Sequence, residues 1–275
     1  MVIREGLKYG TEQLQGVQTA VLDTQLIMCH VMGLDKLKII VNGDRPLNHF
    51  EEKKFKELIK RRKEGEPVKY ILGTCEFMGL DFDVNPHVLI PRPDTEIIVE
   101  AVLERLDRGT LLEIGSGSGC ISVSLAYYNK KINAVSMDIS PDATQTAKKN
   151  AEKNGVSGRV KFITADVFNG IEGVYDAIVS NPPYIETDVI PTLQPEVQRE
   201  PITALDGGPD GLDFYRYITA NAPKHLNEGG LLAFEVGHTQ ADSVSAMMEK
   251  DFKNIQVVKD LAGINRVVLG YKREG

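Results

Sequence analysis

The stretch of sequence that decides the fold is residues 110–138, TLLEIGSGSGCISVSLAYYNKKINAVSMD. A short apolar segment leads into glycines at alternate positions, Gly115, Gly117 and Gly119, and an apolar helical pattern then leads to a second apolar segment that ends at Asp138. Glycines let the backbone turn tightly and approach a ligand, and the following helix directs its N-terminus to the same place. The stretch therefore predicts the beginning of a nucleotide-binding α/β sheet. The alternative is a glycine turn that serves packing alone.

The same alternation continues to the end of the sequence. We expect strands at 110–114, 132–137, 160–163, 175–180, 230–236, 255–259 and 265–270, and helices at 118–128, 141–153, 212–224 and 239–250. Such alternation is typical of a Rossmann-like α/β fold with a mostly parallel, doubly wound sheet. Ligands bind these sheets outside the carboxyl ends of the strands, so the residues that follow the strands are the candidates for a site.

The turn after the first of these strands is the first candidate. It comprises Gly115, Ser116, Gly117, Ser118 and Gly119. A dinucleotide fingerprint would place a further glycine at position 120, where this sequence has cysteine. The spacing therefore suits a nucleoside ligand that lacks a pyrophosphate group.

The second and third strands end in candidate acids. Asp138 stands 19 residues after Gly119, and an acid at about this spacing can accept hydrogen bonds from ribose hydroxyls. Capping of the next helix is its alternative role. After the third strand, the Asp166 carboxylate could bind an adenine amino group, and Val167 could offer an apolar contact and a backbone N–H. A plain turn is the alternative for Asp166.

The fourth strand is followed by the sharpest signal, Asn181-Pro182-Pro183-Tyr184, called the NPPY segment below. Prolines donate no backbone hydrogen bond, so the carbonyls here are free to accept one, and the Asn181 side chain adds another acceptor. The Tyr184 ring adds a flat surface for stacking. Two acceptors and a ring match a planar –NH2 group attached to a π-system. As a bare turn the segment would be ordinary, but it follows a strand of the same sheet as the glycine turn.

Composition and charge exclude several classes of protein. The 275 residues are 42% hydrophobic and 26% charged, as in ordinary globular proteins. No apolar run approaches the ~18 residues of a membrane span, and we expect no secretory signal. Three widely separated cysteines form neither a zinc motif nor a disulfide framework, which favours the cytoplasm. No metal site is visible, and the histidines follow no motif.

The charge distribution argues against a surface that holds free nucleic acid. Residues 1–90 carry 13 basic and 13 acidic residues, and residues 91–275 carry 19 and 26, so neither part is basic. The exception is a basic run of seven residues, Lys53, Lys54, Lys56, Lys60, Arg61, Arg62 and Lys63. Interleaved glutamates favour a solvated helix face for this run. Contact with an acidic or RNA-bound partner is the alternative.

Residues 110–184 resemble the class I S-adenosylmethionine-dependent methyltransferases, and the NPPY segment is similar to that of the branch that methylates amino or amide nitrogen. Further stretches narrow the resemblance: Arg61-Arg62, Gly65-Glu66-Pro67, Tyr70–Gly73, Glu76-Phe77, Leu89–Glu96 (LIPRPDTE), Glu200-Pro201 and Gly207–Asp213 (GGPDGLD). Together they are similar to the peptide chain release factor glutamine methyltransferases (HemK/PrmC type). This second resemblance covers residues 60 to 270.

The resemblance implies a cofactor, a reaction and residue roles. The cofactor is S-adenosyl-L-methionine, with S-adenosyl-L-homocysteine as product, and the methyl acceptor is the glutamine of the Gly-Gly-Gln motif of release factors. Gly115 to Gly119, Asp138, Asp166 and Val167 are expected to hold the cofactor. Asn181 to Tyr184 are expected to hold the glutamine, with Asn181, Pro182 and Tyr184 serving catalysis and Asn181 also close to the cofactor.

The domain organisation follows from the change in pattern near residue 70. We expect a helical substrate-recognition domain at 1–73, with helices at 11–32 and 49–64, then a hairpin linker at 74–93 and the methyltransferase domain at 94–275. The partners are release factors, and we expect neither stable nucleic-acid binding nor a membrane. An adenine-amino methyltransferase acting on DNA or RNA, and a non-catalytic nucleoside-binding module, remain the alternatives.

Overall fold

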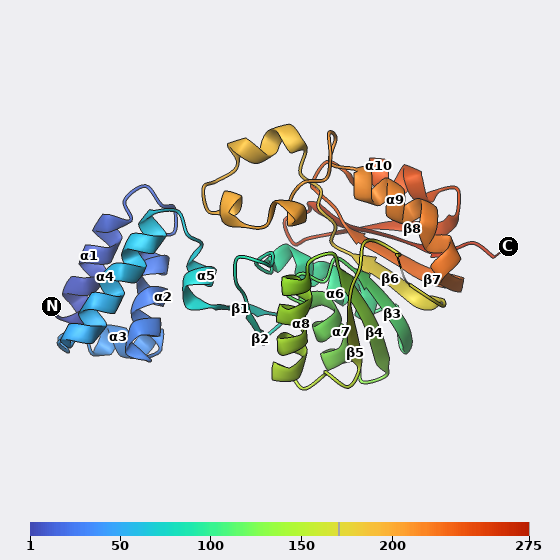
Figure 1. The fold of residues 1–275 in the computed structure, drawn as a ribbon. Helices are drawn as coiled ribbons and strands as arrows, with labels where there is room; N and C mark the ends of the chain where they lie inside the picture. The colour runs from blue at the N-terminus through green and yellow to red at the C-terminus, as the bar shows by residue number, and fades with distance from the viewer. Residues whose placement is uncertain (170, 275) are drawn as a thin grey trace. The chain divides into compact units, whose positions relative to one another are not determined.

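The computed structural model describes residues 1–169 and 171–274 and divides into two compact units. Unit 1 comprises Met1–Thr74 and Gln194–Arg199, and unit 2 comprises Cys75–Leu193 and Glu200–Gly275. The helices of unit 1 are α1 (Ile3–Gln13), α2 (Ala20–Met32), α3 (Lys36–Val41), α4 (His49–Lys63) and α5 (Val68–Leu72). Unit 2 holds the sheet and its helices (Figure 1).

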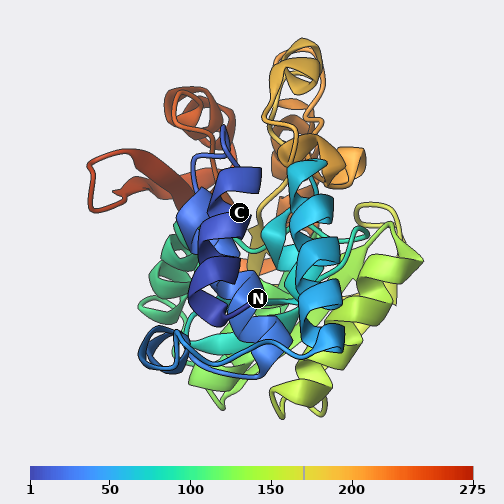
Figure 2. The same ribbon diagram turned by 90° about the vertical axis from the view of Figure 1, so that its left-hand side faces the viewer.

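Helices α1, α2 and α4 pack around the core of unit 1, and Figure 2 shows them in blue to cyan. The predicted helix at 49–64 is α4, whose first turn is capped by the Asn48 side chain. The single helix expected at 11–32 is wrong, because the chain turns between α1 and α2. Gly16 has a φ of +100° in this turn, a backbone conformation that only glycine adopts readily.

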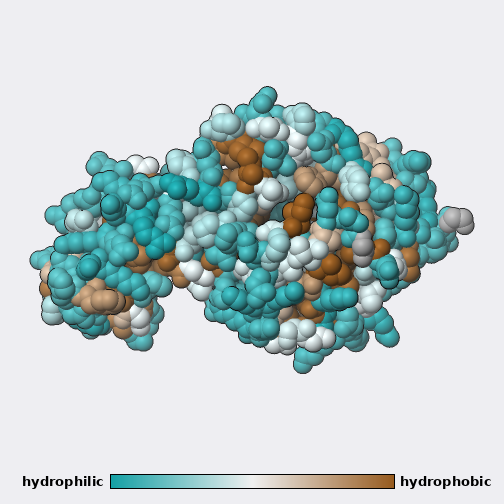
Figure 3. Space-filling model, viewed as in Figure 1, coloured by the Kyte–Doolittle hydropathy of each residue, from teal (hydrophilic) through white to brown (hydrophobic). Residues whose placement is uncertain are grey.

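The basic run lies on α4, and its members differ in their surroundings. The Lys60 side chain is 76% exposed, which fits a solvated face, and the viewed face of unit 1 is largely hydrophilic in Figure 3. Arg62 is instead only 3% exposed. Its guanidinium donates to Asp23 Oδ2 at 2.7 Å and lies 2.5 Å from the Glu196 carboxylate. The solvated-face interpretation is therefore wrong for Arg62, which is a structural cation inside unit 1.

Strands β1 (Thr74–Phe77) and β2 (Leu80–Asp83) form the expected hairpin. Phe77, Leu80 and Phe82 are buried in a hydrophobic cluster of unit 2 together with residues of the large sheet. The hairpin is thus an integral part of the packing of unit 2 rather than a free connector.

The large sheet has the order β5-β4-β3-β6-β7-β9-β8. Its strands are β3 (Gly109–Ile114), β4 (Ile132–Asp138), β5 (Val160–Thr164), β6 (Tyr175–Ser180), β7 (Leu226–Glu235), β8 (Phe252–Lys259) and β9 (Asn265–Lys272). The first five in this order are parallel, and β9 runs antiparallel to both of its neighbours. The expected mostly parallel, doubly wound sheet is confirmed.

Helices cover both faces of this sheet (Figure 1). Helices α6 (Glu96–Leu103), α7 (Cys120–Tyr128) and α8 (Pro141–Lys153) pack on one face, and α9 (Asp213–Asn221) and α10 (Ala241–Met248) pack on the other. Neighbouring residues of one strand point to opposite faces of the sheet. Leu111 packs in the hydrophobic core on the side of α6, α7 and α8, and Leu112 packs in the core on the side of α9 and α10. Two buried faces explain why these strands are apolar throughout instead of alternating.

The chain leaves β3 toward β4 and β5 and later returns to β6 on the other side of β3. Ile114 at the end of β3 is in register with Ser180 at the end of β6. The residues that follow, Gly115 and Asn181, therefore emerge side by side at the point where the strand order reverses, which is where such sheets bind ligands. Within the described ranges, no helix is long and apolar enough to cross a membrane.

Candidate active site

A cavity of about 570 Å³ opens at the carboxyl ends of β3, β4, β5 and β6. Its size lies within the range of small-molecule sites, about 300–1,000 Å³. The wall includes most of the residues singled out from the sequence: Gly115, Ser116, Gly117, Ser118, Asp138, Asp166, Val167, Asn181, Pro182 and Pro183. Four separate strand ends thus bring their candidate residues to one cavity.

The glycine turn is fixed to the neighbouring strand end by its backbone. The N–H groups of Gly115 and Ser116 both donate to the carbonyl of Met137, at 2.9 and 2.8 Å. Gly115 and Gly117 have φ values of +82° and +50°, which residues with a Cβ adopt only under strain. A Cβ on Gly117 would meet no atom within 4 Å. Glycine is therefore needed here for the backbone path, and the space beside Gly117 is open.

Asp138 links the turn to the end of β4. Its Oδ2 accepts from the Gly117 N–H at 2.8 Å, and its Oδ1 accepts from the Ser140 N–H at 2.9 Å. The following helix is capped by Ser140 itself, whose Oγ accepts from Ala143. Burial raises the pKa of Asp138, and these backbone hydrogen bonds oppose the rise. Asp138 thus anchors the glycine turn, and each carboxylate oxygen keeps a lone pair for a hydroxyl donor in the cavity.

Asp166 and Val167 follow β5 on the same wall. The Asp166 carboxylate accepts from the backbone N–H of Val167 at 2.9 Å, and the Asp166 carbonyl accepts from the Asn169 N–H at 2.7 Å, which closes a turn. The Asp166 residue is exposed and Val167 is partly buried. Asp166 therefore forms a turn and also presents its carboxylate to the cavity. The local hydrogen bond uses only one acceptor site of this carboxylate, so others remain for a ligand.

The NPPY segment continues directly from the end of β6. Ser180 Oγ donates to the carbonyl of Ile114 at 2.7 Å, which ties the ends of β6 and β3 together. Asn181 Nδ2 donates to Thr95 Oγ1 at 3.2 Å. Among the described residues, no backbone N–H donates to the carbonyl of Pro182. The Asn181 side-chain amide and the free carbonyl of Pro182 are therefore consecutive acceptor groups next to the glycine turn.

Gly119 and Tyr184 are placed differently from the other candidates, since neither belongs to the cavity wall. A Cβ on Gly119 would lie 3.0 Å from the Ala147 Cβ, so this glycine lets α7 approach α8. The Tyr184 ring lies against Gly237, where a Cβ would be 3.4 Å from Tyr184 Cδ2. Burial raises the pKa of Tyr184 to about 12, so its hydroxyl stays protonated.

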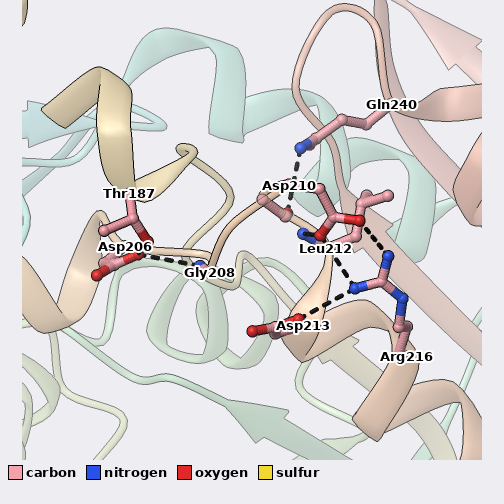
Figure 4. Close-up of polar contacts among 9 residues, drawn as sticks. Thr187, Asp206, Gly208, Asp210, Leu212, Asp213, Arg216 and Gln240 are labelled. Carbon is pink, nitrogen blue, oxygen red and sulfur yellow. Dashed lines mark hydrogen bonds and ion pairs between the residues drawn. The ribbon is translucent and has the colours of Figure 1, made fainter.

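The GGPDGLD loop, Gly207–Asp213, supports the NPPY backbone. Figure 4 shows the polar contacts within and around this loop. A Cβ on Gly207 would lie 2.7 Å from Tyr184 Cα, and one on Gly211 would lie 2.3 Å from the Tyr184 carbonyl oxygen. Only glycine permits an approach this close. Around the loop, Asp206 accepts from Thr187 Oγ1 and the Gly208 N–H, and Arg216 pairs with Asp210 and Asp213. Sequence reasoning gave this loop no role.

Two buried glutamates are further residues without a predicted role. Glu113 in β3 is fully buried and borders the cavity, and Glu235 at the end of β7 is 3% exposed. Burial raises the pKa of each to about 7. The single signal in the sequence was their position at or near the carboxyl end of an apolar strand.

The charges of the wall indicate the kind of ligand that fits. Its carboxyl groups come from Glu113, Asp138, Asp166, Asp206 and Asp213, whereas Arg92 is its one guanidinium among the described residues. An acidic wall attracts a cation and repels polyphosphates. S-adenosylmethionine carries a sulfonium, an ammonium group and ribose hydroxyls. Its charge and hydroxyl donors therefore fit this wall and the free lone pairs of Asp138.

Comparison with known proteins decides the family. Residues 5–73 match the PrmC N-terminal domain family, and residues 93–197 match the methyltransferase small domain family. The release factor glutamine methyltransferase of Geobacter sulfurreducens is 46% identical over 260 residues, 93% of this chain and 91% of the relative. That of Moorella thermoacetica is 40% identical over 282 residues, 100% of both chains.

The chain belongs to the release factor glutamine methyltransferase family. The sequence-based expectation of an S-adenosylmethionine-dependent protein-glutamine methyltransferase is thereby confirmed. A methyltransferase from Pyrococcus furiosus shares the fold, with a TM-score of 0.55 and 21% identity over 72% of this chain and 91% of that chain. Within residues 1–169 and 171–274, no group of three or more histidine, cysteine or acidic residues could hold a metal ion.

Proposed function

We propose that this release factor glutamine methyltransferase methylates the side-chain amide nitrogen of the glutamine in the Gly-Gly-Gln motif of peptide chain release factors, in the cytoplasm. The observation that carries the proposal is the meeting of the NPPY segment and the glycine turn on one cavity wall. A cofactor site next to acceptors for a planar –NH2 group supports amide methylation. The names of the relatives support a release factor as substrate.

The cofactor would be held at the carboxyl ends of β3, β4 and β5. Residues Gly115 to Ser118 would lie against it, Asp138 would accept hydrogen bonds from its ribose, and Asp166 and Val167 would face its adenine. When bound, S-adenosylmethionine supplies a methyl group on a positively charged sulfur. We assign Gly119 to helix packing instead, because it lies outside the wall and touches α8.

The glutamine amide would be held by Asn181 and Pro182. The Asn181 side-chain oxygen and the Pro182 carbonyl would each accept one N–H of the substrate amide. An amide nitrogen is a weak nucleophile because its lone pair is delocalised into the carbonyl. Two fixed acceptors hold this nitrogen in place and stabilise its N–H bonds as they become more positive. Pro183 borders the same space, and Tyr184 would act through its backbone, because its ring lies outside the wall.

Replacement of Asn181 tests the proposal. Asn181→Ala removes one preorganised acceptor, and the loss of one such group lowers turnover by about 10²–10³-fold in other enzymes. Single-turnover methyl transfer to a release factor at saturating S-adenosylmethionine measures this rate, and titration calorimetry measures cofactor affinity. We expect a large loss of rate and a much smaller loss of affinity. A rate near that of the wild type would show that other groups hold the amide.

Matched controls separate this chemistry from alternatives. Asn133→Ala makes the same change at an exposed position of β4 outside the cavity wall, and should leave the rate unchanged. A release factor whose Gly-Gly-Gln glutamine is replaced by glutamate offers no amide and should accept no methyl group. A DNA duplex tests the adenine-amino alternative. Methylation of the duplex, without methylation of the release factor, would overturn the proposed substrate.

A further inference from the structure

The Asn181 side chain is held by a residue that lies far from it in the sequence. Its Nδ2 donates to Oγ1 of Thr95 at 3.2 Å, across 86 positions of the chain. Thr95 ends the 3₁₀ turn Pro93–Thr95 directly before α6, is 2% exposed, and borders the same cavity as Asn181. Thr95 belongs to the LIPRPDTE stretch. The predicted chemistry of the NPPY segment does not by itself assign any role to that stretch.

The direction of the Asn181 amide decides what it can bind. A carboxamide presents an oxygen that only accepts and an –NH2 group that only donates. Only the oxygen can accept an N–H of a substrate amide. If the side chain turned over, its –NH2 group would face the –NH2 group of the substrate, and neither could accept. Asn181 is therefore useful in only one of its two orientations.

Thr95 fixes this orientation only if its own hydrogen is committed elsewhere, because a hydroxyl can donate as well as accept. Glu235, at the end of β7, is the acceptor that we assign to this hydrogen, because the residue is 3% exposed and its Oε2 has no hydrogen-bond partner among the described residues. Burial raises the pKa of Glu235 to about 7, and the polar side chains of Thr95 and Asn181 oppose that rise. When the Thr95 O–H donates to the Glu235 carboxylate, the lone pairs of Thr95 remain for the Asn181 –NH2 group.

We propose that Thr95 is a positioning residue that holds the Asn181 amide with its oxygen free for the substrate N–H. The proposal rests on the proposed function, in which Asn181 accepts from the glutamine amide. Thr95 acts through Asn181 and needs no contact with the reacting atoms. Its hydroxyl, rather than its methyl group, carries the role.

Two substitutions of similar size separate the hydroxyl from the methyl group. Thr95→Val keeps the shape and loses the hydroxyl, whereas Thr95→Ser keeps the hydroxyl. Single-turnover methyl transfer at saturating S-adenosylmethionine should slow by about tenfold or more in Thr95→Val, a part of the loss expected for removing Asn181 itself. Cofactor affinity should change by less than about threefold, and Thr95→Ser should restore most of the rate.

Three results of these rate and affinity measurements would overturn the proposal. Wild-type turnover in Thr95→Val would show that the contact does not matter. Equal losses in Thr95→Val and Thr95→Ser would assign the effect to packing of the methyl group. A loss of cofactor affinity as large as the loss of rate would make Thr95 a cofactor ligand. Thr219→Val is the matched control, because Thr219 is a buried threonine of α9, outside the cavity wall, whose hydroxyl has no hydrogen-bond partner in the described chain.

A second measurement keeps this proposal separate from the proposed function. Hydrogen exchange of the Asn181 side-chain –NH2 group, followed by NMR, needs no substrate. We expect exchange to speed up in Thr95→Val and to remain slow in Thr95→Ser. If wild-type protein fails to methylate release factors, the proposed function fails while this experiment still decides the role of Thr95. Unchanged exchange in Thr95→Val would overturn it.

Discussion

Gln240 donates from Nε2 to the backbone carbonyl of Tyr184 at 3.0 Å. The same nitrogen donates to the carbonyl of Gly211 at 3.1 Å, and Gln240 Oε1 accepts from the Gly237 N–H at 3.0 Å. One side-chain amide thus joins the NPPY segment, the GGPDGLD loop and the end of β7, and Figure 4 shows it above the loop. Both of its donors and its acceptor are used, so it fixes the backbone that carries Asn181 without touching the cavity.

Gln240→Glu is expected to loosen the NPPY segment. The carboxylate that results has no N–H to donate and sets an oxygen against the carbonyls of Tyr184 and Gly211. Leaving partly buried groups unsatisfied costs about 1–3 kcal/mol of unfolding free energy. Urea unfolding measures this loss, and methyl transfer should fall with it. Gln145→Glu makes the same change at an exposed position of α8 and should alter neither quantity.

Asp138→Asn is expected to weaken cofactor binding by about 1.5–3 kcal/mol, the usual worth of hydrogen bonds to a charged group. The structure adds a second reason, because Asp138 also holds the Gly117 N–H, and an asparagine would present an –NH2 group to one of its two N–H partners. Titration calorimetry with S-adenosylmethionine measures the change. Asp142→Asn, at an exposed position of the next helix, is the control. Unchanged affinity in Asp138→Asn would move the ribose contact elsewhere.

The sheet and the meeting of ten candidate residues at one cavity were predictable from the sequence, because their signals are local. Each apolar strand is followed by a short polar turn, and parallel strands place their carboxyl ends at one edge. The adjacency of Gly115 and Asn181 follows from that rule and is realised by the register of Ile114 with Ser180. Predicting this adjacency required no knowledge of contacts between side chains that are distant in the sequence.

The residues that support the site were not predictable in this way. Thr95 and Gln240 act through side chains that contact the NPPY segment from 86 and 56 positions away, and such contacts leave no periodic pattern. The resemblance singled out the stretches around Thr95 and Gly211 but gave neither a role. The turn at Gly16 was missed because apolar residues continue at helical spacing on both sides of it. The stacking role of Tyr184 stays a prediction; its ring packs near Gly237, and the residue lies outside the cavity wall.

Arg62→Met is expected to destabilise unit 1 by about 3–5 kcal/mol, because it leaves the buried Asp23 carboxylate without its cation. The side chains of Arg62 and Asp23 are 4% and 3% exposed, so water cannot replace the lost partner. Urea unfolding followed by the helical circular dichroism signal measures the effect. Lys60→Met removes an exposed charge from the same helix and should change stability little. Equal effects of the two substitutions would mean that the buried Arg62–Asp23 pair contributes no more to stability than an exposed charge on the same helix.

Glu113→Gln is expected to make the stability of the protein less sensitive to alkaline pH than that of the wild type. Burial raises the pKa of Glu113 from 4.5 to about 7, and the Ser136 hydroxyl, which donates to it, offsets only part of this. The folded state therefore holds a proton that the unfolded state releases between these values. The stability that this proton brings is fully present below pH 4.5 and is lost as the pH rises through about 7.

Glutamine has no charge to bury, so the variant escapes this loss. Between pH 5 and pH 8.5, the difference in unfolding free energy between variant and wild type should move in favour of the variant by about 2–3 kcal/mol. Urea unfolding at both pH values measures that difference, and the comparison with wild type cancels groups that titrate alike in both proteins. Glu100→Gln, at an exposed position of α6, should give the same difference at both pH values. A constant difference for Glu113→Gln as well would show that Glu113 is ionised in the fold throughout this range.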